Sequence, residues 1–406
     1  MIYIFVTYCG FEVCYYMYNT YYTYKQLDNI NYNINRGILT DNMSMNIYNQ
    51  FKQYFTNETN LTKYFRDSFL NKKSITLNNI SKILSYHIFN IHPNTPPNNP
   101  LKIHNTEYIN NLLDIIKQKV ELGTINETDD ETEVISVHYM INKLNILHKP
   151  YILYMIMYII RKIFNIYMYI KGYKYIIDPA TNIKVWIKYN KLDNIPLVFL
   201  HGFGMGILPY INKINNLSYN RTIIIPEIPN MSYDLYKMPP PSIDTIINVI
   251  YDILLKQNIT QIDIMGHSFG TTILNAFQLK YPQMCNCKTY AEPVCFYIQQ
   301  PQLTHIVYKS YRLSYNFIKY LLYILIFRDQ YIQYITKRCM FAEQSLINIF
   351  DKKTTIILAK YDYLLPATHI YDYIRTYYPT VNLFMRDGVH GSWIMDDTND
   401  IDSTDL

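Results

Sequence analysis

The residues with the clearest capacity for chemistry are the pentapeptide GHSFG at 266–270. An alternating apolar run precedes it and apolar residues at helical spacing follow it, which predicts a strand, a sharp turn and a helix. Ser268 would sit at the turn on strained backbone with its hydroxyl exposed, and Gly266 and Gly270 leave room where strand and helix pass close together. Because the chain has only 11 glycines in 406 residues, this spacing is not expected by chance. We therefore expect Ser268 to be a nucleophile rather than part of a plain turn.

A serine hydroxyl reacts slowly at neutral pH unless a base lies within about 3 Å and a third group orients that base. Two later stretches supply candidates, because Asp362 follows the apolar run TTIILAK and His390 follows VNLFMRD. Loops at the carboxyl ends of parallel strands meet at one edge of a sheet. The sequence therefore predicts that Ser268, Asp362 and His390, in this chain order, converge at such an edge.

These residues and their surroundings resemble the α/β-hydrolase fold superfamily. The resemblance extends over residues 173–397 and includes the GHSFG turn, the loop HGFGMG, the spacing D-x-x-x-P and the stretch G-x-H-G. It implies that Ser268 is the nucleophile, that His390 is the general base, and that Asp362 orients the imidazole and stabilises its cation. PEIPN, AEPVCF and the elbow together are also similar to an uncharacterised hydrolase branch of fungal and protist type, which suggests no substrate.

A hydrolase of this kind needs donors for the oxyanion, each worth about 3 kcal/mol. We expect one donor to be the amide of Phe269 at the start of the helix after the nucleophile. The HG-x loop of the resembling family points to the amide of Phe203 as the other donor, with that of Gly204 as the near alternative. Four residues are expected to support the site without taking part in the reaction: His201, Gly202, Gly204 and His267.

Two acidic residues leave alternatives open. Glu292, in AEPVCF, competes with Asp362 as the acid, because some proteins of this fold carry the acid after that strand. Asp362 could instead only cap the turn before Pro366. Glu227, in PEIPN, stands where many members of the resembling family have a glycine-rich loop, so substrate contacts from that loop are not assumed.

The distribution of apolar residues predicts the architecture. Strands and helices alternate from residue 173 onward, which predicts a doubly wound, mostly parallel α/β sheet, beginning with a β-hairpin. Residues 297–350 have a mostly helical pattern and lie between the predicted strands KTYAEPVCF and TTIILAK. This segment is too long for an ordinary connection, so we expect an inserted cap. The predicted divisions are a mainly helical extension at 1–135, an amphipathic helical connector at 136–172, the hydrolase domain at 173–397 with its cap at 297–350, and an acidic tail at 398–406.

Two apolar segments raise the question of a membrane. The first 18 residues lack a basic n-region and a cleavage site, so a signal peptide is not expected, whereas a buried segment, an interfacial segment and an anchor all remain open. Residues 151–170 are apolar but carry Arg161 and Lys162 near the middle, which disfavours a spanning helix. Packing against the domain or lying on a membrane surface fits better. We therefore expect an intracellular protein, cytoplasmic or membrane-associated, with peripheral membrane contact as one alternative.

Composition narrows the functional classes further. The net charge of +5 is small and the cations are scattered, so nucleic-acid binding is not expected. The six cysteines lack zinc-site spacing and are expected to be free thiols. We expect no cofactor and no metal. The prediction is a serine hydrolase that cleaves an ester or related acyl bond through an acyl-enzyme, with a small-molecule or lipid substrate suggested by the apolar cap. The alternative is an inactive hydrolase-fold protein that acts as an interaction or membrane-tethering module.

Overall fold

The structure is a computed structural model, and it describes most of the chain. The described residues are 2–22, 27, 39–58, 61–67, 75–92, 95–120, 125–126, 144–192, 194–229, 240–297, 320, 323–340 and 351–395. The predicted acidic tail and most of the predicted cap lie outside these residues. The described part of the hydrolase domain includes every predicted site residue.

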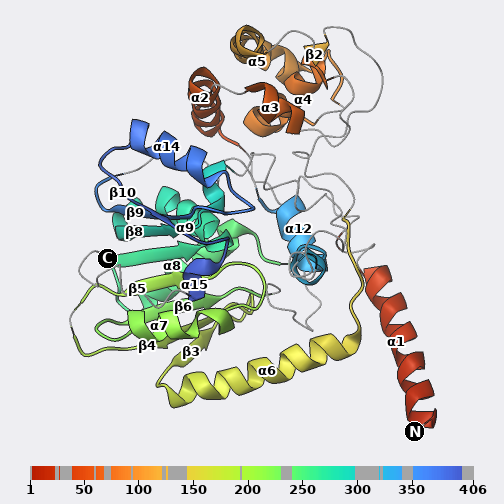
Figure 1. Ribbon diagram of the computed structural model, residues 1–406, viewed down its shortest axis with the longest axis vertical. Helices are drawn as coiled ribbons and strands as arrows, with labels where there is room; N and C mark the ends of the chain where they lie inside the picture. Colours follow the sequence, from red (N-terminus) through yellow and green to blue (C-terminus); the bar gives the residue numbers. More distant parts are fainter. Residues whose placement is uncertain are drawn as a thin grey trace.

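Eight strands form one mixed sheet at the centre of the main domain (Figure 1), in the order β10-β9-β8-β7-β5-β6-β4-β3. Neighbours from β10 to β6 are parallel, whereas β4 pairs antiparallel with both β6 and β3. The strands are β3 (Lys174–Ile177), β4 (Lys184–Lys188), β5 (Leu197–Leu200), β6 (Ile223–Glu227), β7 (Ile262–His267), β8 (Cys285–Ala291), β9 (Thr354–Ala359) and β10 (Asn382–Arg386). The predicted mostly parallel sheet is confirmed, and β3 and β4 form the predicted hairpin.

Helices cover both faces of this sheet. In β5, Val198 and Leu200 face one side while Leu197 and Phe199 face the other, as the period of two requires. The first face carries α8 (Ile243–Lys256), α9 (Phe269–Lys280) and α14 (Ala367–Tyr377), and the second carries α6 (Tyr151–Ile170), α7 (Ile211–Leu217) and α15 (Ser392–Met395). Burial on both faces explains why the central strands are continuous apolar runs.

The helices before residue 120 have a core of their own. This helical unit consists of α2 (Asp41–Asn57), α3 (Leu61–Asp67), α4 (Leu77–Phe89) and α5 (Pro100–Lys119), with a short parallel pair, β1 (Ile75–Thr76) and β2 (Ile125–Asn126). The apolar side chains of its core include Phe55 and Ile116, which are fully buried. The unit lies beside α14 (Figure 1), where Glu58 Oε2 is 2.9 Å from His369 Nε2.

Helix α6 is continuous through its two cations and packs against the domain with one face. Its buried side chains include Phe164 and Met168, which join the core on the second face of the sheet. Arg161 Nη2 donates to Glu227 Oε1 at 2.6 Å, so the cation in the middle of the helix faces the protein. Among the described residues, α6 is the one helix whose length and composition would allow it to cross a membrane.

The N-terminal helix α1 (Ile2–Tyr22) contacts the beginning of α6. The backbone N–H of Tyr151 donates to Glu12 Oε1 at 2.8 Å, which places a carboxylate at the N-terminal end of α6. The ring of Tyr15 packs against the rings of Tyr151 and Tyr154. The two helices run in different directions from this contact (Figure 1).

The described part of the cap consists of a π-helical turn, η6 (Tyr323–Phe327), and α12 (Gln330–Arg338). The segment before α6 holds this part in place, because Lys149 Nζ and Asp329 Oδ2 form a buried ion pair at 3.1 Å. The backbone N–H of Leu147 also donates to the carbonyl of Arg328 at 3.0 Å. The chain just before α6 and the cap therefore form one packed structure.

Candidate active site

Ser268 lies in the sharp turn between β7 and α9. Its backbone has φ 51° and ψ −122°, a conformation that costs a residue with a side chain about 1–3 kcal/mol. Larger residues are excluded by sterics at both flanking positions. A Cβ at Gly270 would lie 2.1 Å from the carbonyl oxygen of Leu200, and a Cβ at Gly266 would lie 2.6 Å from the carbonyl oxygen of Gly270. The turn therefore presents Ser268 at the carboxyl end of the central strand.

Ser268, His390 and Asp362 are connected in this order by two hydrogen bonds. His390 Nε2 is 2.9 Å from Ser268 Oγ, and His390 Nδ1 is 2.7 Å from Asp362 Oδ2. The other oxygen of Asp362 accepts from the backbone N–H groups of Leu364 and Leu365 at 2.7 and 3.0 Å. Capping the turn and holding the imidazole are therefore not alternatives, because the two oxygens of one carboxylate do both.

The surroundings of His390 favour its protonated form more than water does. Burial by itself lowers the pKa of His390, but the charge and hydrogen bond of Asp362, together with the charge of Glu292, outweigh it and raise the pKa above its usual value. An imidazole of raised pKa is a stronger base. His390 can therefore accept the proton of Ser268 and keep the resulting charge beside Asp362.

The loop after β5 passes directly beside the nucleophile. A Cβ at Gly202 would lie 3.0 Å from the Cβ of Ser268, a tight contact that a glycine avoids. The rings of Phe203 and Phe269 stack with centroids 4.3 Å apart. The amide of Phe269 begins α9, where an N–H has no acceptor within the helix. The structure thus brings Phe203 and Phe269 next to each other, and the binding of an oxyanion by their amides stays a prediction.

Comparison with known proteins agrees with this topology. Residues 195–307 match the family model of the alpha/beta hydrolase fold. The chain carries a domain of the α/β-hydrolase fold superfamily. This domain includes the elbow, the loop after β5 and the loops after β8, β9 and β10.

Individual relatives of the hydrolase domain are distant. Abhydrolase domain-containing protein abhd-5.2 of Caenorhabditis elegans is 28% identical over 111 residues, which are 26% of this chain, so the match spans a quarter (25%) of that relative's length. A hydrolase from Pseudomonas aeruginosa covers 58% of this chain with 96% of its own length, at 11% identity and a TM-score of 0.41. A carboxylesterase from Nitrososphaera gargenis covers 56% with 94% of its own length, at 14% identity and a TM-score of 0.39.

Glu292, the alternative acid, does not hydrogen-bond to His390. Its Oε2 is 3.9 Å from His390 Nδ1, beyond hydrogen-bonding distance, and 2.9 Å from His267 Nε2. The same carboxylate accepts from the backbone N–H of Gly391, and Glu292 itself has a positive φ of 47°. Asp362 is therefore the carboxylate that contacts the imidazole, while Glu292 holds the backbone next to it.

A chain of buried hydrogen bonds connects Glu292 to the loop after β5. The Gly202 N–H donates to the Tyr210 hydroxyl oxygen at 3.0 Å, and that hydroxyl lies 2.7 Å from His267 Nδ1. Burial lowers the pKa of His267 despite its bond to Glu292, so the ring is neutral. Burial also raises the pKa of Glu292, but the bond from His267 and the charge of His390 outweigh it and lower the pKa to about 2.

These protonation states determine which atom is the donor and which is the acceptor in each of these hydrogen bonds. An ionised carboxylate only accepts, so His267 Nε2–H donates to Glu292, which leaves His267 Nδ1 to accept from the Tyr210 O–H. The loop after β5 and the loop that carries His390 are therefore both connected by hydrogen bonds to the carboxylate of Glu292. Tyr210 is a member that the sequence did not reveal, because one tyrosine among 44 carries no signal.

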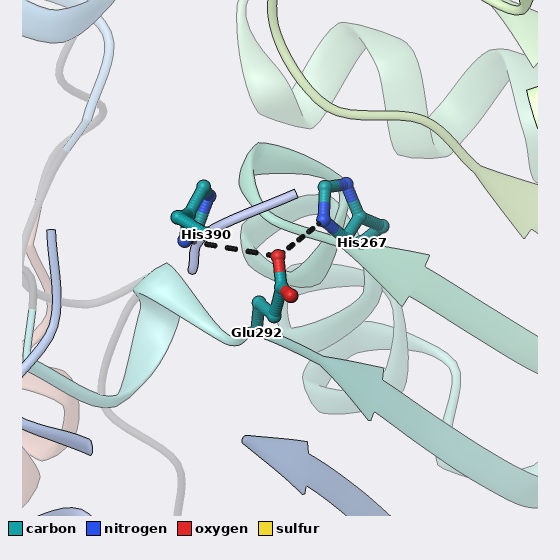
Figure 2. A group of neighbouring side chains, drawn as sticks. All are labelled: His267, Glu292 and His390. Atoms are coloured by element: carbon teal, nitrogen blue, oxygen red, sulfur yellow. Dashed lines mark hydrogen bonds and ion pairs between the residues drawn. The ribbon is translucent and has the colours of Figure 1, made fainter. Parts of the chain in front are cut away.

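Three of these side chains also have the composition of a metal site. Figure 2 shows Glu292 between His267 and His390, with ligand atoms that lie within 4.8 Å of one another. Each atom already has a hydrogen-bond partner, since His267 binds Glu292 and His390 binds Asp362. A cation would have to displace these bonds, and we interpret the group as a hydrogen-bonded network.

The remaining predicted residues surround the site as follows. His201 Nε2 accepts from the Ile228 N–H at 3.3 Å, so its Nδ1–H donates to the Gly202 carbonyl at 2.8 Å, which fixes the loop. Gly204 has φ +119°, and its position lies beside Ile326 of η6. Glu227 makes ion pairs at 2.6 Å with Arg161 of α6 and Lys184 of β4, so its carboxylate holds these two elements together.

Proposed function

We propose that this protein is a serine hydrolase that cleaves ester or related acyl bonds through an acyl-enzyme. The observation that carries the proposal is the hydrogen-bonded sequence of Ser268 Oγ, His390 and Asp362, with distances of 2.9 and 2.7 Å. Such a sequence converts an unreactive hydroxyl into a nucleophile.

The reaction follows from the roles of these groups. His390 Nε2 takes the proton of Ser268 Oγ as that oxygen attacks the acyl carbon, and the cation that forms is stabilised by Asp362. The negative oxygen of the tetrahedral intermediate is bound by the amides of Phe203 and Phe269. His390 then donates its proton to the leaving alcohol, and water repeats the sequence on the acyl-enzyme to release the acid.

The substrate class is proposed from the apolar groups around the nucleophile. The half-buried ring of Phe203, which stacks on the buried ring of Phe269, and the half-buried side chain of Ile326 beside Gly204 offer an apolar surface for an acyl chain. Of the cap residues that suggested a lipid substrate, Phe317, Leu321 and Leu322 lie outside the described residues. Esters of medium or long apolar acids fit this surface better than charged substrates do.

The proposal is tested with the Ser268→Ala variant. We expect it to lose hydrolysis of p-nitrophenyl esters and labelling by a fluorophosphonate, in which the serine oxygen bonds to phosphorus and fluoride leaves. Ser44→Ala, in the separate helical unit, is the matched control and should keep both. Labelling that persists in Ser268→Ala would exclude this serine as the nucleophile.

An alternative function is a non-catalytic tether on a hydrolase scaffold. The observation in its favour is the large exposed apolar surface of α1 and α6, which a simple esterase does not need. If the wild-type protein neither hydrolyses esters of any chain length nor reacts with a fluorophosphonate, this alternative replaces the enzyme.

A further inference from the structure

The outer face of α6 carries a straight line of exposed isoleucines. Their spacing alternates between four and three residues, which keeps them on one side of the helix. They are Ile152, Ile156, Ile159, Ile163, Ile166 and Ile170, with exposed fractions from 47% at Ile156 to 77% at Ile170. The neighbouring strand β3 adds Tyr175 and Ile177 on the side of the sheet that carries α6, and both are also exposed. We call these side chains of α6 and β3 the apolar face.

This face is held rigidly by the opposite side of the same helix. Phe164 and Met168 are buried in the domain core, and Arg161 is paired with Glu227. Burial alone would raise the pKa of Glu227, but Arg161 and Lys184 lower it to about 2, so the carboxylate stays charged. If α6 left the domain to cross a bilayer, this partly buried ion pair would be separated. The helix is therefore built to lie along a surface.

Within residues 151–177 the charges are all of one sign. Residues 151–177 contain no Asp or Glu, and Lys162, Lys171 and Lys174 are exposed within them. Three tyrosines with a polar tip and an apolar ring are exposed as well, namely Tyr158, Tyr169 and Tyr175. Isoleucines flanked by lysine and tyrosine match the boundary between acyl chains and anionic headgroups.

A second copy of the chain fits this face less well. The line of isoleucines is centred on the helix, so an antiparallel pair of α6 helices would bring Lys162 of one copy close to Lys162 of the other. No carboxylate within residues 151–177 would offset that repulsion. The apolar surface also continues sideways onto β3, which makes it wider than the narrow seam of a helix pair.

We propose that the apolar face docks the protein on an anionic lipid surface, with α6 lying in the plane of the interface. The docked helix is in contact with the cap, because Leu325 packs against the cluster of Tyr154 and Met157 on α6. The next residue, Ile326, lies beside Gly204 in the loop next to Ser268. Docking therefore places the entrance of the site near lipid. This consequence for the substrate rests on the proposed function, whereas the docking itself does not.

The test measures flotation of the full chain with vesicles of phosphatidylcholine, alone or with about one third phosphatidylserine. The wild type should bind the anionic vesicles more strongly than the neutral ones. Ile159→Ser/Ile163→Ser should weaken binding by about tenfold or more, because both side chains would insert into the interface. The control is Leu101→Ser/Ile103→Ser on α5, whose side chains are similarly exposed (64% and 61%, against 52% and 61%).

Two further variants separate the possible explanations. Lys162→Glu/Lys174→Glu should abolish the preference for anionic vesicles. Ser268→Ala should bind as the wild type does, so that docking and catalysis can fail independently. The proposal is overturned if the wild type does not float, if Ile159→Ser/Ile163→Ser floats unchanged, or if the wild type is a dimer in sedimentation velocity that this double variant converts to a monomer.

Discussion

His390 faces two carboxylates that have different tasks. Asp362 is within hydrogen-bonding distance of His390 Nδ1, whereas Glu292 lies 3.9 Å from the same atom. The oxygens of Glu292 instead accept hydrogen bonds from His267 and from backbone N–H groups. The positive φ of both Ser268 and Glu292 shows that backbone strain is concentrated at these two positions. Glu292 therefore acts on His390 through charge and position, and Asp362 acts by direct contact.

Removing the charge of Glu292 should move the pH dependence of the proposed hydrolysis. Activity needs neutral His390, and it is lost as the pH falls through the raised pKa of that imidazole. Glu292→Gln removes one source of the increase, so the acid limb of kcat/KM should shift to lower pH, with a loss in kcat of about tenfold. Asp362→Asn should cost about a thousandfold or more, because the amide has no charge to stabilise the imidazolium and its NH2 group can face Nδ1 as a donor, which favours the wrong tautomer.

Tyr210→Phe is the control for this experiment, since it breaks the hydrogen-bond chain to Gly202 but leaves the charge of Glu292 in place. Its acid limb should stay where that of the wild type lies. If Glu292→Gln were as damaging as Asp362→Asn, Glu292 would be the acid of the triad after all. An unmoved acid limb in Glu292→Gln would mean that its charge does not act on His390.

At the scale of elements, the elbow depends on how closely β5 and α9 approach. The Cβ of an alanine at 270 would lie 2.1 Å from the Leu200 carbonyl oxygen, which is backbone and cannot rotate away. Strand and helix would have to separate, and that strain reaches both Ser268 and the loop after β5. The glycine is thus a requirement of packing that also positions the nucleophile.

Gly270→Ala should lower the free energy of unfolding by about 3 kcal/mol or more, the upper end of what overpacking costs. Urea denaturation followed by circular dichroism measures the change. Gly10→Ala is the control, because nothing lies within 4 Å of a Cβ there and alanine favours the helix of α1. Equal stabilities of Gly270→Ala and wild type would mean that the approach of β5 and α9 is looser than the structure has it.

At the scale of the whole molecule, two hydrophobic cores meet at a titratable contact. The helical unit has its own buried cluster, and Glu58 reaches from it to His369 on α14 at 2.9 Å. The hydrogen bond of Glu58 raises the pKa of His369, against the smaller opposing effect of burial. A histidine with a raised folded-state pKa stabilises the contact below its ordinary pKa of about 6.5. That contribution disappears as the pH rises through the raised value.

The helical unit should therefore be held more loosely above this range than below it. Hydrogen exchange of α2 and α14, corrected for the intrinsic rate, should be faster at pH 8.5 than at pH 6. His369→Asn should remove this difference. The effect is expected to be modest because His369 is 42% exposed and solvent screens the pair. A difference that persists in His369→Asn would assign it to another group.

The sequence by itself determined the features that depend on near neighbours in the chain. The elbow, the buried strands and the hairpin follow from glycine positions and apolar periodicity, which act within about 15 residues. The serine, histidine and aspartate were identified as candidates by their places after strands. The mostly parallel sheet agreed with the predicted α/β-hydrolase fold, whose family model matches residues 195–307.

Only the tertiary structure decided which partners those residues meet. Asp362 and Glu292 both follow a strand and carry the same charge, so distances between strand ends had to choose the one that binds His390. Tyr210 enters the site through a fold contact that no local pattern marks. Helix α6 is apolar on both faces, and periodicity cannot say which face meets the domain. The pairing of Arg161 with Glu227 decides it, because a cation in the middle of an apolar helix turns toward its buried counter-ion and leaves the isoleucines outside.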